Sequence, residues 1–199
     1  SITKAIAKAK GSKFIAEAFS NSPPYFMTNS GCSSGATDSS HNNLRGNAYN
    51  AFAKYLADVI AHFNLDDGQV TFTSATGMNE PYTNYWGANS NKQEGCHFDQ
   101  GDSQSRVIRA LNWNLHDKGV HNCIVSGTDE TSIDTAINSY NALDQYAKET
   151  ISRIDTHTYG GSKRYELREL AENEHKNLWM SEVDGDFTAG DNAGHMASA

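Results

Sequence analysis

The chain has 199 residues, which is enough for one domain with a sizeable core and too few for two large ones. Its 16 Lys and Arg against 24 Asp and Glu give a net charge of −8, spread along the chain, so nucleic acid is excluded as a partner. No apolar run reaches the ~18 residues of a membrane span and the start lacks the apolar stretch of a signal peptide, so we expect a soluble protein with no membrane partner.

The first part of the chain alternates between helix and strand patterns. Apolar residues at helical spacing from Ile2 to Ala9 predict an opening helix, and residues 13–19 predict a strand. A long polar loop, 20–45, then precedes a helix whose apolar stripe runs from Tyr49 to Phe63.

The next stretch, 70–81, is rich in β-branched residues and ends in Asn79, Glu80 and Pro81. We interpret it as a buried strand. Proline cannot continue a strand ladder and biases the residue before it toward extended backbone, so we expect Glu80 at the C-terminal rim of the strand. A second long loop, 82–101, leads to a helix that begins near Asp102 and ends at Gly119.

The last third repeats the alternation. Residues 122–126 and 151–156 predict strands, and the helix between them has its N-cap in the segment 131–134. A short helix around 167–171 and a strand at 177–182, which ends in Glu182, complete the pattern, and the tail from Asp191 can begin one more helix.

Five strands separated by helical crossovers favour a parallel sheet. The long, carboxylate-bearing loops follow the strands, as they do in a (β/α)8 TIM barrel, whose sites lie at the C-terminal face. A doubly wound sheet is the rival fold, but neither a glycine-rich phosphate loop nor a dinucleotide fingerprint occurs. We therefore predict an α/β fold in which residues 1–199 form a single but partial TIM barrel of about five βα units.

Two strand-end glutamates suggest the chemistry of this fold. Retaining glycosidases place an acid/base carboxyl and a nucleophilic carboxylate about 5 to 5.5 Å apart. Glu80 and Glu182, at the mouth of one barrel, are our candidates for this pair, and the acid/base needs its pKa raised by partial burial or by the neighbouring carboxylate. A strand-end glutamate is by itself more often a solvated surface residue.

Further residues are candidates for contacts around this pair. Asn79 is placed to donate a hydrogen bond to a sugar hydroxyl, and His157 and Tyr159 are placed to hydrogen-bond Glu182 and keep it ionised. His157 can also be read as a structural histidine. Glu130, together with Asp129, either lines the cleft or caps the helix after Thr131.

Aromatic residues in the loops after the strands are candidates for sugar stacking or for loop packing. Trp86 is the first candidate for stacking among them, and the set is Tyr25, Phe26, Tyr82, Tyr85, Trp86 and Phe187.

The cysteines and histidines allow further inferences. Cys32 and Cys96 lie in polar loops and are read as a disulfide, which would imply an extracellular setting, while Cys123 lies in an apolar run. The eight histidines form no HExxH-type pair, so we expect no metal and no cofactor.

Several segments resemble a known family. Residues 18–28, 93–99 and 156–160, with Asn79-Glu80-Pro81 and the strand that ends in Glu182, resemble glycoside hydrolase family 30 and within it the endo-β-1,6-galactanases. The resemblance runs from the third strand of that barrel to just beyond the seventh. It implies that Glu80 is the general acid/base and Glu182 the nucleophile.

From these observations we expect a secreted, monomeric, retaining endo-glycosidase that cleaves β-1,6-galactan, such as arabinogalactan side chains, without a cofactor. Two alternatives stay open. One is the same chemistry on another β-glycan, such as glucan or xylan, and the other is a catalytically silent carbohydrate-binding fragment of a barrel. A serine hydrolase is disfavoured because no Gly-x-Ser-x-Gly elbow occurs.

Overall fold

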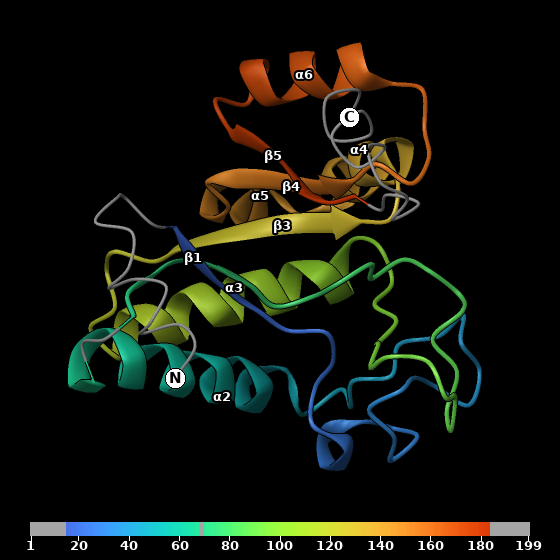
Figure 1. The fold of residues 1–199 in the computed structure, drawn as a ribbon, viewed down its shortest axis with the longest axis vertical. Helices are drawn as coiled ribbons and strands as arrows, with labels where there is room; N and C mark the ends of the chain where they lie inside the picture. Colours follow the sequence, from blue (N-terminus) through green and yellow to red (C-terminus); the bar gives the residue numbers. More distant parts are fainter. Residues whose placement is uncertain (1–14, 68–69, 184–199) are drawn as a thin grey trace, which may run out of the picture.

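A computed structural model describes residues 15–67 and 70–183. Five strands form one parallel sheet in the order β1-β2-β3-β4-β5 (Figure 1). Their bounds are Ala16–Phe19 for β1, Phe72–Thr76 for β2, Ile124–Glu130 for β3, Arg153–His157 for β4 and Asn177–Glu182 for β5. Strand order that follows chain order is what successive right-handed βα units produce, and the sheet with its helices is part of a (β/α)8 barrel. The predicted fold class is confirmed.

The helices between the strands form the outer layer. They are α2 (Tyr49–Ala61), α3 (Asp102–Asp117), α4 (Ile133–Ala142), α5 (Gln145–Thr150) and α6 (Arg164–Asn173), with short helical turns at η1 (Tyr25–Met27) and η2 (His62–Asp67). The helices α2 and α3 lie side by side, and α6 covers the far end of the sheet (Figure 1).

The core lies between the helices and the sheet. Buried apolar residues recur at helical spacing along α2 and α3 and meet the outward side chains of the strands, chief among them Phe52, Ile60, Val107, Ile108, Leu111, Leu115, Val125 and Ile154. Burial of this kind of side chain contributes about 1.5 to 3 kcal/mol each, so this layer supplies most of the stabilisation of the sheet.

The inner face of the sheet is polar instead. The Arg153 guanidinium donates to the Asp155 carboxylate at 2.5 and 2.8 Å, forms an ion pair with Glu17, and lies 3.9 Å from the centre of the Trp179 ring. Burial is the largest influence on Asp155 and raises its pKa to about 6. These contacts join β1, β4 and β5 across the concave side of the sheet.

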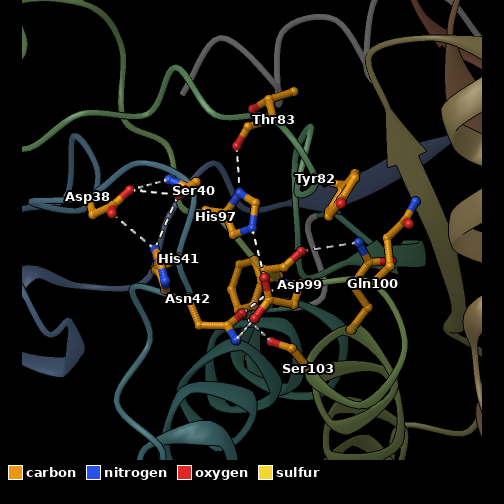
Figure 2. Close-up of polar contacts among 12 residues, drawn as sticks. Asp38, Ser40, His41, Asn42, Tyr82, Thr83, His97, Asp99, Gln100 and Ser103 are labelled. Carbon is orange, nitrogen blue, oxygen red and sulfur yellow. Dashed lines mark hydrogen bonds and ion pairs between the residues drawn. The ribbon is translucent and has the colours of Figure 1, made fainter.

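The loops after β1 and β2 lie together beyond the C-terminal ends of the strands, drawn in blue and green in Figure 1. Backbone hydrogen bonds join them, from Ala36 N to Trp86 O at 3.0 Å and from Asn43 N to His97 O at 3.2 Å. Side chains add to this. Figure 2 shows His97 between the Thr83 carbonyl oxygen (2.6 Å) and the Asp99 carboxylate (3.1 Å).

The same cluster fixes both loops to α3. Asn42 donates to the Asp99 carboxylate, and its amide oxygen accepts from the Ser103 hydroxyl in the first turn of α3 at 2.7 Å (Figure 2). The loop that carries Glu80 is therefore fixed in place by the first turn of α3 and by the loop after β1.

The boundaries differ from the expected ones in three places. The strand expected at 70–81 ends at Thr76, the strand expected at 122–126 runs on to Glu130, and α5 is a separate helix that the apolar pattern did not reveal. The expected N-cap before α4 is confirmed, since the Ser132 side chain accepts from Thr135 N. The predicted helices at 2–9 and from Asp191, and Phe187, lie outside the described residues.

The predicted Cys32–Cys96 disulfide is wrong. Both residues carry free thiols, as does Cys123. The Cys32 sulfur faces the Asn89 side chain at 3.4 Å, whereas the Cys96 sulfur is buried and lies 3.7 Å from the His97 carbonyl oxygen. Burial raises the pKa of the Cys96 thiol to about 12, so it stays protonated.

In the described part of the chain, none of the helices has the length and apolar character needed to cross a bilayer.

Candidate active site

Glu80 lies just beyond the end of β2, in a backbone conformation that non-glycine residues rarely adopt. Its φ is +44°, so it is left-handed and not extended as the following proline led us to expect. Glu80 N donates to Asp129 O at 2.8 Å, and Glu80 O accepts from Trp86 Nε1 at 3.1 Å and from Thr83 Oγ1 at 2.9 Å. These bonds offset the strain and fix the direction of the carboxylate.

Both oxygens of Glu80 accept hydrogen bonds. Oε1 lies 3.0 Å from Nδ1 of His157, which is the last residue of β4, and Oε2 accepts from the Tyr85 hydroxyl. Burial raises the pKa of Glu80, but the bonds from His157 and Tyr85 and the charge of His157 outweigh burial and leave the pKa below its ordinary value. The pKa of Glu80 is therefore lowered in the unliganded site, whereas the sequence led us to expect a raised pKa.

His157 stands among three carboxylates. Its Nδ1 faces Glu80, and its Nε2 lies 3.5 Å from Asp129 Oδ1 and 3.7 Å from Glu182 Oε2. Burial lowers the pKa of His157, but the hydrogen bonds and charges of Asp129, Glu80 and Glu182 raise it to about 10. The imidazole is thus a cation that links all three carboxylates.

Glu182 ends β5 on the other side of His157. Its Oε1 accepts from the Tyr159 hydroxyl at 2.8 Å, as the sequence led us to expect. The hydrogen bond expected from His157 to Glu182 goes to Glu80 instead, and Glu182 retains only the longer ion pair. Since Glu80 and Glu182 contact opposite nitrogens of one ring, the two carboxylates lie in one site.

Asn79 precedes Glu80 and is buried, yet neither its amide oxygen nor its amide nitrogen has a hydrogen-bond partner among the described residues. Buried amides are nearly always paired, so an unpaired one next to a candidate catalytic group points to a ligand. This agrees with the predicted contact between Asn79 and substrate, which stays a prediction.

Two predicted substrate contacts are contradicted. Trp86 is only 3% exposed, and its ring packs on Gly95 beneath the Glu80 segment, so it cannot present a face to a sugar. Glu130 is fully buried (0% exposed), and its carboxylate accepts from Tyr82 N, Gln104 and Ser139. Burial raises the pKa of Glu130 to about 7. Both side chains are buried and support the loops from inside the protein.

Tyr25 and Phe26 are exposed, as a stacking platform must be, but they contact each other edge to face with ring centres 5.5 Å apart. Tyr25 lines a groove of about 710 Å³ between β1 and α2, which also includes Phe19, Ser20 and Glu94. Neither aromatic residue contacts Glu80 or Glu182 in the described structure, so their part in binding stays a prediction.

The sequence left the place of two residues of the site open. Asp129 was read either as lining the cleft or as capping the helix after Thr131, and β3 carries it into the site, where its Oδ1 accepts from the Ser181 hydroxyl at 2.5 Å. Tyr85 was one of several loop aromatics, and nothing in the sequence pointed to its bond with Glu80. The only available signal was its position five residues after Glu80.

Among residues 15–67 and 70–183, no group of three or more His, Cys, Asp or Glu side chains is arranged to hold a metal ion. The titratable side chains that the site brings together are three carboxylates, one imidazole and two phenols. Two carboxylates that contact the same imidazole, with an unpaired amide beside one of them, suit acid/base and nucleophilic work on an acetal.

Comparisons with known proteins point the same way. The family profile "O-Glycosyl hydrolase family 30" matches residues 3–155. An endo-beta-1,6-galactanase from Hypocrea rufa is 37% identical over 185 residues, which are 92% of this chain and 37% of that protein. An exo-beta-1,6-galactobiohydrolase from Bifidobacterium longum subsp. longum is 29% identical over 214 residues, covering 87% of this chain and 14% of that protein.

A solved structure shows the same fold. The family 30 subfamily 8 xylanase Xyn30A from Clostridium acetobutylicum superposes with a TM-score of 0.64 at 20% identity, over 89% of this chain and 41% of that one. The chain thus spans little more than a third of the Hypocrea rufa relative and about a seventh of the Bifidobacterium one.

Proposed function

The chain belongs to O-glycosyl hydrolase family 30, and from that premise we propose that it supplies the catalytic carboxylates of a retaining endo-β-1,6-galactanase. The observation that carries the proposal is the convergence of Glu80 and Glu182 on His157. The two relatives support the β-1,6 linkage, because both are named as enzymes that cleave β-1,6-linked galactose chains. The endo mode has support from one of them only.

In the first step Glu182 attacks the anomeric carbon while Glu80, protonated, gives its proton to the glycosidic oxygen. The bond from the anomeric carbon to that oxygen breaks, and a glycosyl ester forms on Glu182. Tyr159 donates to Glu182 Oε1, so the attacking oxygen would be Oε2, which makes the longer 3.7 Å contact with His157. Asn79 would donate to a sugar hydroxyl in the transition state.

In the second step Glu80, now a carboxylate, takes a proton from water as the water attacks the anomeric carbon. The ester bond breaks and Glu182 is released as a carboxylate. His157 favours the ionised form of Glu80 that this step requires. Two displacements at one carbon give a product with the configuration of the substrate.

The test is replacement of Glu182 in the full-length protein. Glu182→Gln should lower kcat on β-1,6-galacto-oligosaccharides by at least about 10³-fold. Glu149→Gln is the matched control, since Glu149 is exposed on α5, and it should be indistinguishable from the wild type. Unchanged hydrolysis by Glu182→Gln would refute the nucleophile role.

The acid/base role has a separate test. Glu80→Gln should lose about 10²- to 10⁴-fold on oligosaccharides and much less on an aryl galactoside with an acidic leaving group, because that group departs without a proton. Equal losses on both substrates would argue against a general acid.

Chromatography of early products separates an endo enzyme, which releases products of mixed lengths, from an exo enzyme, which releases products of one length.

We also propose that the protein acts outside the cell and as a monomer. The free thiols remove the disulfide argument for secretion, so the support that is left is the polymeric substrate, which is too large to enter a cell intact. Secretion is checked by assaying culture supernatant, and the monomer by the mass of the full-length protein in solution.

A further inference from the structure

Glu80 is held by two donors of different accessibility. His157, which bonds Oε1, is 1% exposed, whereas Tyr85, which bonds Oε2, is 39% exposed and belongs to the loop after β2. Oε1 therefore faces the interior of the site, and Oε2 faces its open side. The Tyr85 hydroxyl therefore lies on the side of Oε2 from which a glycosidic oxygen would arrive from solvent.

We infer that Tyr85 is a positioning residue that holds Glu80 ionised and correctly aimed in the free enzyme and yields Oε2 to the leaving-group oxygen of the substrate. The inference rests on the proposed function, because it assigns Glu80 the acid/base role. It adds Tyr85 as a residue that affects the reaction only through its hydrogen bond to Glu80.

The two steps of a retaining mechanism need opposite protonation states of Glu80, and Tyr85 separates them. While its hydroxyl bonds Oε2, the carboxylate form is favoured, as the base step requires. When the substrate displaces the hydroxyl, that bond is lost and water is excluded, and both changes raise the pKa of Glu80 toward the value that an acid needs.

Tyr85 itself does not supply the proton. Burial and the bond to Glu80 raise the pKa of its phenol above the ordinary value, so it stays a donor at every working pH. The other charged groups that face Glu80 and Tyr85 are the His157 cation, the Asp129 and Glu182 carboxylates beyond it, and Lys92, whose ammonium lies 5.4 Å from the centre of the Tyr85 ring. Thr131 Oγ1 lies 3.3 Å from the phenol oxygen.

The experiment is the pH profile of kcat/KM for the full-length protein and its Tyr85→Phe variant on a β-1,6-galacto-oligosaccharide. The basic limb of this profile reports the loss of protonated Glu80 in the free enzyme. One hydrogen bond to a charged group corresponds to a pKa change of about one unit, so the basic limb should move upward by about one pH unit. The acidic limb should not move.

Two further variants make the result decisive. Tyr165→Phe also removes an exposed phenol, but one on α6 that takes no part in the hydrogen bonds of Glu80 within the described chain, so its profile should match the wild type. Replacing Tyr85 by 3-fluorotyrosine keeps the fold and strengthens the donor, so the basic limb should move downward. Shifts of opposite sign from these two changes at position 85 support the inference.

Failure of the inference about Tyr85 and failure of the proposed function give different results. A basic limb that stays in place in both position-85 variants, in a protein that Glu80→Gln inactivates, overturns the role of Tyr85 and leaves the proposed function standing. Full activity of Glu80→Gln on oligosaccharides overturns the proposed function and the inference together.

Discussion

His157 determines how charge is distributed among the residues of the site. Three carboxylates within 3.0 to 3.7 Å of one imidazole would repel one another strongly if the ring were neutral. Protonation of the ring, which a pKa of about 10 ensures near neutral pH, leaves each carboxylate with a positive neighbour. His157 is therefore a fixed cation and not a base, and this is why Glu80 is ionised before substrate arrives.

Asn79 offers a test at the same scale. Its amide is buried without a partner, so Asn79→Ala removes an unsatisfied polar group and should leave the free energy of unfolding unchanged or raise it. If the amide bonds a sugar hydroxyl in the transition state, the same change should lower kcat by about 10²-fold, with a smaller effect on KM. Steady-state kinetics and thermal unfolding of the full-length protein measure the two effects.

Asn84→Ala is the control for this prediction, because Asn84 is exposed in the same loop, and both quantities should match the wild type. A variant at position 79 that loses stability and keeps its kcat would show that the amide serves the fold.

At the scale of elements, the loop after β2 is built around Trp86. A methyl group on Gly95 would lie 2.0 Å from the Trp86 ring, and that ring donates to the backbone of Glu80. Gly95→Ala must therefore push the ring, and with it the Glu80 segment, out of place. We expect a stability loss of about 1 to 3 kcal/mol and a lower kcat, measured by denaturant unfolding and by hydrolysis.

Gly87→Ala is a matched control in the same loop. A methyl group there meets nothing within 4 Å, and Gly87 does not have a positive φ. Wild-type stability and activity are expected for it. Equal behaviour of the two alanine variants would show that the Trp86–Gly95 contact does not position Glu80.

The strands and helices were predictable because their patterns are local. Alternation of apolar runs, the N-cap at Ser132 and the stop at Gly119 all depend on neighbouring residues. The end of β3 was not predictable in this way. The segment 127–130 looks like a turn, but its pairing with β4, Thr128 with Asp155 and Glu130 with Thr156, overrides local preference.

The residues of the site also differ in how far the sequence could predict their positions. The proximity of Glu80 and Glu182 was predictable because Glu80 follows β2 and Glu182 ends β5, and parallel strands bring their C-terminal ends together. Whether a loop side chain faces the cleft or the protein depends on how the loop folds back, which no spacing shows. Trp86 was misplaced for this reason, and the bond of Tyr85 to Glu80 was missed. Glu130 was misplaced because β3 runs on to it and its carboxylate is buried.

For the whole molecule, the sheet has two strands with one partner each. In the described structure β1 pairs only with β2 and β5 only with β4, whereas a closed barrel has no edges. Large apolar side chains are exposed along these two strands, namely Ile15 next to β1, Phe19, Leu178 and Trp179. Such an edge can pair with another chain, so it is a site of association unless further strands cover it.

We therefore expect residues 1–199, produced alone, to self-associate in size-exclusion chromatography and light scattering at concentrations where the full-length protein is a monomer. Phe19→Lys combined with Leu178→Lys should reduce this association, since charges on edge strands oppose pairing. Tyr165→Lys, at an exposed position on α6 and not on either edge strand, should not reduce it. A monomeric chain of residues 1–199 under the same conditions would contradict the inference that the edges of β1 and β5 drive association.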